Sequence, residues 1–371
     1  MMFSRLRLSA LFFAPLILSA CGPSDEAVVE KAAAELKKDG AQKAAPAESN
    51  GAAPTGLLAA TGLAAKDERA EIILLLPDTR IPLQEFQRNG LSMLVGRQAG
   101  YQLTTQDAAG SSAQQMEQFR QAIAAKPAAI FISPIDPPAV AALIVEAKTH
   151  GITVIGLDKR MLNEGCASIV YCDQKHVGRM AADTVIEALK RKAAEEKRSD
   201  VTGRVVQLRG TADSFAANEL AEGFSEGLKT QPGVILVHDA PADWSTENAT
   251  KRTAEAFALQ KNFDAVFAHN DAMASGAAKA AETAGQRENV FILGTDGLSG
   301  QKRGLELVRV GELDATVVQP ALVDLALQIV MRVRTDKTFK PQPFYEIEPV
   351  VILPKNVEQS IRVGTYNLPK L

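Results

Sequence analysis

The feature that most constrains the fold of this 371-residue chain is a regular alternation of short apolar runs with amphipathic stretches. The short runs are typical of buried strands, and the amphipathic stretches of roughly 12 to 18 residues predict helices. Strands that alternate with helices require crossover connections, which produce parallel sheets with helices on both faces. The alternation begins at Glu71 and starts again after Asp173. We therefore predict an α/β fold with two Rossmann-like lobes and parallel sheets.

The individual elements follow from the same pattern. Helices are predicted to start near Pro82 and Pro138, and Gly151 and Gly285 are predicted to end helices just before strands. Strands are predicted over residues 72–76, 129–133, 152–157, 204–208, 234–237, 265–269, 290–293 and 315–318. Helices are predicted over residues 84–98, 138–149, 177–190 and 215–229, with further helices between the later strands.

Polar residues follow most of these predicted strands. In open parallel sheets, ligands bind beyond the carboxyl ends of the strands. The residues at these positions are mainly carboxylates and amides, without a nucleophile beside a general base. They therefore predict a binding protein and not an enzyme. They include Arg80 and Gln84 after the first strand, Asp158 and Lys159 after the third, and Asn270, Asp296 and Gln319 in the second half.

Composition excludes several other classes of protein. Lys and Arg number 41 against 44 Asp and Glu, a net charge of −3, whereas nucleic-acid-binding proteins normally carry a basic excess. Glycine-rich phosphate loops are missing from the sequence, so a nucleotide-dependent enzyme is not expected. The four histidines lack metal-ligand spacing, so neither a metal nor another cofactor is expected. Cys166 and Cys172 are not expected to pair, because an extended segment between them would hold them too far apart.

The N-terminus has the pattern of an export signal. Arg5 and Arg7 precede an apolar stretch, residues 8–17, that is too short to span a bilayer. The following Leu-Ser-Ala-Cys, which ends at Cys21, resembles a bacterial lipobox. We expect residues 1–21 to be a lipoprotein signal peptide with Cys21 lipidated, the alternative being a soluble secreted protein. Residues 22–70 are rich in Ala and predict a flexible tether, or alternatively a small helical domain. The expected location is the periplasm or cell envelope, with either membrane possible.

Five segments of the chain are distinctive, three of them strongly so. The stronger ones are VIGLD at 154–158, VFAHNDAMA at 266–274 and LGTDG at 293–297, and the weaker ones are ANE at 217–219 (followed by EGF at 222–224) and PADW at 241–244. On these segments, residues 71–355 resemble periplasmic sugar-binding proteins of the ribose/galactose type, the receptor components of ABC importers.

The resemblance implies a type I periplasmic binding protein whose lobes are joined by three chain crossings, here near Asp173, Pro320 and Ile347. The implied N-terminal lobe comprises residues 71–173 and 320–347, and the C-terminal lobe residues 174–319 and 348–360. Closure of the lobes around a hinge would bury a ligand between their strand ends.

The resemblance also implies roles for individual residues. Asp158, Asn270, Asp296 and Gln319 are expected to bind sugar hydroxyls, because carboxylates accept from hydroxyls and amides both donate and accept. Trp244 is expected to stack on the sugar ring. Each has a structural alternative: a turn for Asp296, a helix cap for Asn270, core packing for Trp244.

Departures from the ribose-type pattern count against ribose as the ligand. Ile-Pro-Leu-Gln at 81–84 replaces the family's Asn-Pro-Phe-Phe, so two aromatic residues are missing. Lys159 and Asn218 stand where the family has Arg, and neither can replace the bidentate guanidinium. Another sugar or a cyclic polyol is expected, with Arg80 and Gln84 as further contacts.

The expected function is that of a monomeric, lipid-anchored binding protein that delivers a sugar or polyol to the permease of an ABC importer. The alternative is a ligand-sensing lipoprotein that presents its closed form to a membrane receptor or sensor kinase. A DNA-binding repressor of the related fold is excluded, because an export signal stands where its helix-turn-helix would be.

Overall fold

The computed structural model describes residues 69–159, 161, 165–363, 368–369 and 371. The predicted signal peptide, Cys21 and almost all of the predicted tether lie outside the described residues. The first strand, β1, starts at Ala70, two residues before the predicted strand over residues 72–76. Among the described residues, no helix is both long enough and apolar enough to cross a bilayer.

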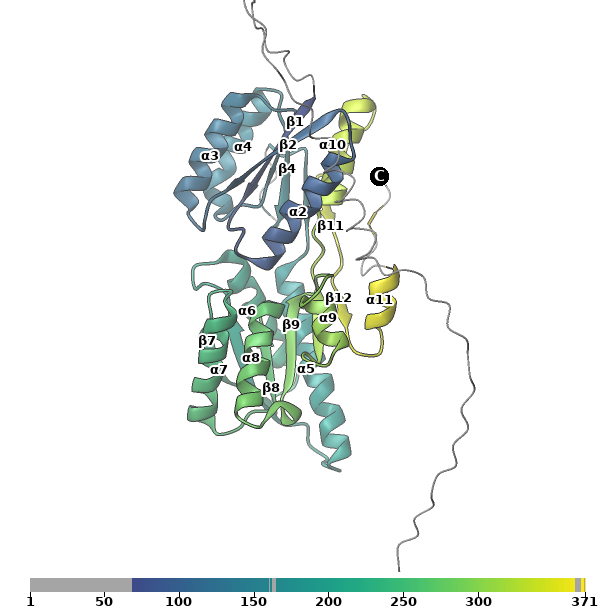
Figure 1. Cartoon of the computed structure of the whole chain (residues 1–371). Coiled ribbons are helices and arrows are strands. Elements are labelled where there is room, and N and C mark those ends of the chain that lie inside the picture. Colours follow the sequence, from purple (N-terminus) through teal and green to yellow (C-terminus); the bar gives the residue numbers. More distant parts are fainter. Residues whose placement is uncertain (1–68, 160, 162–164, 364–367, 370) are drawn as a thin grey trace, which may run out of the picture. The chain divides into compact units, whose positions relative to one another are not determined.

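The first sheet has six strands in the order β11-β5-β4-β3-β1-β2, all parallel. Its strands are β1 (Ala70–Leu76), β2 (Tyr101–Asp107), β3 (Ala129–Ile132), β4 (Thr153–Asp158), β5 (Ser168–Tyr171) and β11 (Phe344–Glu346). Helices α2 (Pro82–Gly96) and α10 (Val323–Thr335) cover one face, and α3 (Ser112–Ala125) and α4 (Pro137–Thr149) cover the other (Figure 1).

The second sheet repeats this order as β12-β10-β9-β8-β6-β7, with only β12 antiparallel to its neighbour. Its strands are β6 (Gly203–Arg209), β7 (Val234–Pro241), β8 (Ala265–Ala268), β9 (Phe291–Asp296), β10 (Ala315–Val318) and β12 (Val350–Ile352). Helices α5 (Gln174–Glu195) and α6 (Phe215–Leu228) pack on one face. Helices α7 (Thr246–Gln260), α8 (Asp271–Thr283), α9 (Gly304–Arg309) and α11 (Val357–Val363) lie on the other side, and a short 3-10 helix, η1 (Arg287–Asn289), precedes β9.

Between its described strands and helices, the chain passes from one sheet to the other three times. The first passage joins β5 to α5, the second joins β10 to α10, and the third joins β11 to β12. Each sheet has its own apolar cores on both faces, so each lobe is a three-layer α/β unit. The predicted α/β fold class is therefore confirmed.

The sequence pattern missed β2 and α3. Strand β2 lies at the edge of its sheet, and none of its residues is fully buried. An edge strand needs few apolar residues, so Tyr101–Asp107 lacks the continuous apolar run that marks the central strands. Helix α3 follows directly and is rich in Gln, with buried Gln115 beside Phe119 and Ile123. Its low apolar content conceals its helical period.

Candidate ligand-binding site

A cavity of about 350 Å³ lies at the carboxyl ends of the strands and takes residues from both lobes. This volume is within the range of about 300–1,000 Å³ that is usual for small-molecule sites. Eight of the nine residues predicted to bind the ligand line it: Arg80, Gln84, Asp158, Lys159, Trp244, Asn270, Asp296 and Gln319. The other side chains of the lining include Asp78, Ser133, Gln174, Asp213, Ser214, Leu220 and His269.

Asp158 ends β4 and is 8% exposed. Its carboxylate accepts hydrogen bonds from Gln84 Nε2 at 3.3 Å and Gln87 Nε2 at 2.5 Å. Gln87 also donates to the carbonyl of Ala321 at 3.0 Å, in the second passage between the lobes. The side chain of Gln87 therefore joins a cavity carboxylate to the second passage between the lobes. The sequence reasoning missed Gln87, although its place one helical turn after Gln84 could have indicated it.

Asp296 ends β9 and is 5% exposed. Gln319 Nε2 lies 3.5 Å from its Oδ1, and Gln319 Oε1 accepts from Gln174 Nε2 at 2.6 Å. Burial, reinforced by the nearby carboxylates of Asp271 and Asp158, raises the pKa of Asp296 well above its usual value. The Asp296 carboxylate is thus poorly compensated by the protein itself.

Three buried polar atoms of the lining have no hydrogen-bond partner among the described residues. They are Gln84 Oε1, Ser133 Oγ and Asn270 Nδ2. Buried polar groups are normally paired, and leaving one unpaired costs about 1–3 kcal/mol. Their grouping around one cavity provides two acceptor groups and two donor groups for a polar ligand, since the Ser133 hydroxyl can act as either.

Asn270 combines its two predicted roles. Its Oδ1 accepts from the backbone N–H of Met273 at 2.8 Å and so caps helix α8. Its amide nitrogen is the unpartnered atom that borders the cavity. The capping bond fixes the direction of the side chain, which leaves the NH₂ group in place to donate to a ligand.

Trp244 is half-buried and lies at the second-lobe side of the lining, beside His269. Gly210 permits this position, because a Cβ at that residue would come within 2.1 Å of the indole ring. His269 is fully buried, and burial lowers its pKa to about 3. At neutral pH its ring is therefore uncharged, and its Nδ1 accepts from the N–H of Gly210 at 3.4 Å.

The two basic residues of the lining are both engaged by the protein. The Lys159 ammonium donates to the backbone carbonyls of Pro134 and Ile135, and burial lowers its pKa to about 8. Arg80 has a 78% exposed side chain and pairs with Asp78 at 2.6 Å. Backbone carbonyls therefore hold the Lys159 ammonium, and Arg80 lies at the solvent edge of the cavity.

Asn218 is the one predicted ligand-binding residue that does not line this cavity. This residue is exposed on α6 and is not part of the lining, whereas Ala216 and Leu220 are. Residues four apart lie on one face of a helix, and the residue midway between them points to the opposite side. Position 218 therefore faces solvent.

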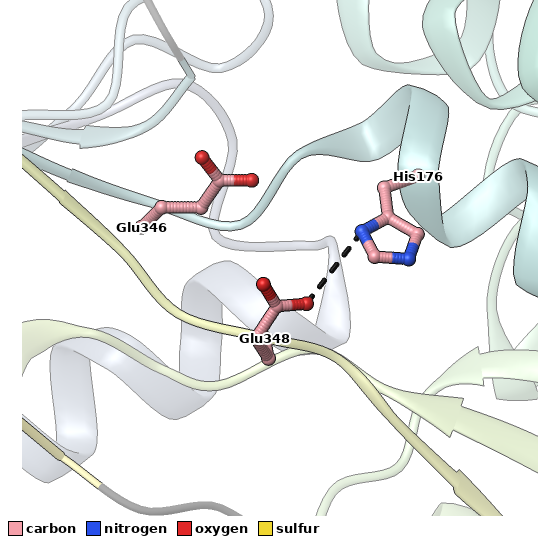
Figure 2. Close-up of side chains that lie close together, drawn as sticks. All are labelled: His176, Glu346 and Glu348. Carbon is pink, nitrogen blue, oxygen red and sulfur yellow. Dashed lines mark ion pairs between the residues drawn. The ribbon is translucent and has the colours of Figure 1, made fainter.

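One group of described side chains could hold a metal ion, and it lies outside the cavity lining. The ligand atoms of His176, Glu346 and Glu348 lie within 4.8 Å of one another, with His176 Nδ1 3.6 Å from Glu348 Oε2 (Figure 2). The group links the start of α5 to the third passage between the lobes. Sequence spacing could not predict it, because 170 positions separate His176 from Glu346.

Comparison with known proteins gives matches over most of the chain. A family model described as a periplasmic binding protein domain matches residues 72–334. A ribose import binding protein of Haemophilus influenzae is 28% identical over 225 residues, which cover 60% of this chain and 72% of that protein.

Two solved structures share the fold. The fructose binding periplasmic domain of a hybrid two-component system has a TM-score of 0.70 at 23% identity, covering 79% of this chain and 94% of that one. The myo-inositol binding protein of Caulobacter has a TM-score of 0.70 at 22% identity, covering 82% of this chain and 99% of that one.

Proposed function

From the premise that this chain belongs to the periplasmic binding protein domain family, we propose that it captures a sugar or sugar-like polyol and delivers it to an ABC importer. The predicted resemblance to this family is confirmed. The ligand class, the importer and the lipid anchor are our proposal.

The observation that carries the proposal is the chemistry of the cavity. Carboxylates and amides from the strand ends of both lobes surround the cavity, and three buried polar atoms of its lining have no hydrogen-bond partner among the described residues. Adjacent hydroxyls of a sugar or cyclitol can donate to Asp158 and Asp296 and accept from Asn270. The indole of Trp244 offers an apolar face for the C–H side of such a ring.

The names of the relatives agree with this chemistry. The Haemophilus influenzae relative is a ribose import binding protein, and the Caulobacter structure is bound to myo-inositol. Ribose and myo-inositol both carry closely spaced hydroxyls on a small ring. We assign this class of ligand to the cavity, with Arg80, Gln84, Lys159 and Gln319 completing the site.

Ligand capture is proposed to proceed by hinge closure. We assign residues 71–173 and 320–347 to one lobe and 174–319 and 348–360 to the other. Because Asp158 and Asp296 belong to different lobes, a ligand that contacts both would hold the lobes together. The closed surface would then be what the permease recognises.

The test of the site is a calorimetric titration of the protein with sugars and polyols that raise its melting temperature in a screen. The double substitution Asp158→Ala and Asp296→Ala is expected to abolish binding of any ligand found. Asp183→Ala, on the exposed side of α5, is the matched control and should bind normally. Unchanged affinity of the double variant would refute the assignment of the site.

The lipid anchor is proposed from the sequence at Cys21. Two or more acyl chains give stable membrane attachment where one does not. Mass spectrometry of the mature protein should find a diacylated N-terminal cysteine, and Cys21→Ala should release the protein from membranes. An unmodified N-terminus would contradict the anchor without affecting the proposed ligand.

A sensing role is the second candidate, because one structure of this fold is the periplasmic domain of a hybrid two-component system. Uptake of the radiolabelled ligand distinguishes the two roles. Deletion of the gene should abolish uptake if the protein serves an importer. Normal uptake with loss of a ligand-induced transcriptional response would favour the sensor.

A further inference from the structure

The charged residues that line the cavity are mainly acidic. Of the described residues, four aspartates and two basic residues contribute; Arg80 lies at the solvent edge, and backbone carbonyls hold the Lys159 ammonium. The charged lining residues are Asp78, Asp158, Asp213 and Asp296, with Arg80 and Lys159. Only Asp78 pairs directly with one of these two basic side chains.

Among the residues that the structure describes, no cationic side chain forms an ion pair with either of the two most buried of these carboxylates, Asp158 and Asp296. Between described residues, the hydrogen bonds to the carboxylate of Asp158 come from the amides of Gln84 and Gln87. The corresponding bond to Asp296 comes from the amide of Gln319, at the long distance of 3.5 Å. Buried carboxylates are normally paired with a cation, since desolvation of an unpaired charge is costly.

From this arrangement, and resting on the proposed function, we infer that the preferred ligand is an aminated sugar or aminated cyclitol whose protonated amine binds between Asp158 and Asp296. An ammonium group offers three donors and no acceptor, whereas a hydroxyl offers a single donor. The positive charge of the amine would balance the negative charge of these carboxylates. Arg80 and Lys159 do not, because Arg80 pairs with Asp78 and Lys159 bonds to backbone carbonyls.

The environment of the carboxylates provides further acceptors for such an amine. Gln84 is 7% exposed and donates its Nε2 to Asp158, which leaves its Oε1 unpartnered beside the same carboxylate. Together with Asp158 and Asp296, this oxygen gives the amine acceptors from both lobes. The unpartnered Asn270 Nδ2 remains free to donate to a hydroxyl of the same ligand.

The electrostatics of Asp296 agree with this arrangement. Burial is the main cause that raises the pKa of Asp296; Asp271 and Asp158 raise it further, and Arg303 lowers it. Arg303 is itself paired with Glu85 at 2.9 Å. A cation placed between Asp158 and Asp296 would relieve the repulsion between the two carboxylates, and binding would become tighter as Asp296 ionises.

The experiment compares matched ligands by calorimetry on the full-length protein in mild detergent at pH 7. The pairs are D-glucose with D-glucosamine, D-galactose with D-galactosamine, and myo-inositol or scyllo-inositol with its monoaminodeoxy derivatives. We expect at least one aminated member to bind ten or more times as tightly as its neutral partner. Its affinity should also fall as salt is added.

The substitutions Asp158→Asn and Asp296→Asn test the position of the amine. Asn tolerates the left-handed backbone at both sites, so the fold should persist, which thermal melting verifies. Each should reduce the ratio of aminated to neutral affinity at least fivefold, whereas the control Asp183→Asn should preserve it.

Three outcomes overturn the inference in distinguishable ways. Neutral members that bind as tightly as the aminated ones in every pair would overturn it and leave the proposed function standing. Binding of neither kind would overturn both. A preference for the amine that survives both Asn substitutions would refute the assigned position.

Discussion

Asp158 and Asp296 occupy corresponding places in the two lobes. Each ends the third strand in the order of its sheet, β4 in one case and β9 in the other. Both have a positive φ, 69° and 94° respectively. Non-glycine residues in this region are strained, and such strain persists where surrounding structure enforces it, often at functional sites. The backbone turn at each strand end thus places a carboxylate at the cavity.

Asp271 lies directly behind Asp296 and is 5% exposed. Its Oδ2 accepts from the N–H of Gly297 at 2.7 Å, and burial raises its pKa to about 7. A carboxyl whose pKa is raised by folding binds more protons in the folded than in the unfolded state between about pH 4 and 7. This group therefore lowers the free energy of unfolding as the pH rises through that range.

Asp271→Asn removes this pH dependence while keeping the side-chain shape and an acceptor for Gly297. The variant should become progressively more stable than the native protein as the pH rises from about 4 to about 7, with a constant difference below pH 4. Urea unfolding at a series of pH values measures this difference. A difference that is independent of pH would show that folding leaves the pKa of Asp271 close to its usual value.

At the scale of elements, helices α5 and α6 form the closest helix contact in the second lobe. A Cβ at Gly223 of α6 would come within 2.0 Å of the carbonyl oxygen of Lys175 in α5. A Cβ at Gly178 of α5 would come within 2.3 Å of the Leu220 carbonyl oxygen in α6. This contact connects the hinge to the cavity, since α5 begins after the first passage and Leu220 lines the cavity.

Gly223→Ala is therefore expected to push the two helices apart. The free energy of unfolding should fall by about 1–3 kcal/mol, as for other overpacked interiors. Ligand affinity should fall as well, because α6 carries part of the lining. Gly96→Ala, at an exposed end of α2 with open space around its Cβ, is the matched control and should leave both unchanged or slightly improve stability. Equal stabilities of the two variants in denaturant titrations would contradict this account.

At the scale of the whole folded body, three passages of the chain join two independently packed lobes. The second passage contains Leu322, which has a φ of 67°. Gln87 contacts this passage by donating to the carbonyl of Ala321. A direct contact also crosses between the lobes: Glu85 of α2 pairs with Arg303, just before α9, at 2.9 Å. Opening of the hinge would separate this pair, so it favours the closed arrangement.

Glu85→Gln should accelerate ligand dissociation by a factor of about 1.4 to 5, since partly exposed ion pairs contribute about 0.2–1 kcal/mol. The effect should shrink at high salt, where the native pair is screened. Stopped-flow dissociation measurements at low and high salt provide the test. Glu306→Gln, which breaks a pair with Arg309 within α9, is the control and should leave the rate unchanged. An equal acceleration in both variants would argue against a role for the Glu85 pair in closure.

The sequence by itself determined the α/β fold class and the polar character of the strand ends. Central strands need continuous apolar runs, and the residue after each such strand is fixed by chain order. For this reason Asp158, Asn270 and Asp296 could be selected as candidates before any coordinates. Edge strand β2 and helix α3 were missed, because their partly exposed surfaces weaken the apolar pattern.

Only the tertiary structure decided which side chains meet. Gln87 reaches Asp158 from 71 positions away, and His176 meets Glu346 and Glu348 across two separate passages of the chain. The tertiary structure also decided that Asn218 is exposed and that the Lys159 ammonium donates to backbone carbonyls. Such contacts depend on how elements that are far apart in the sequence pack together in space. Local sequence patterns carry no information about that packing.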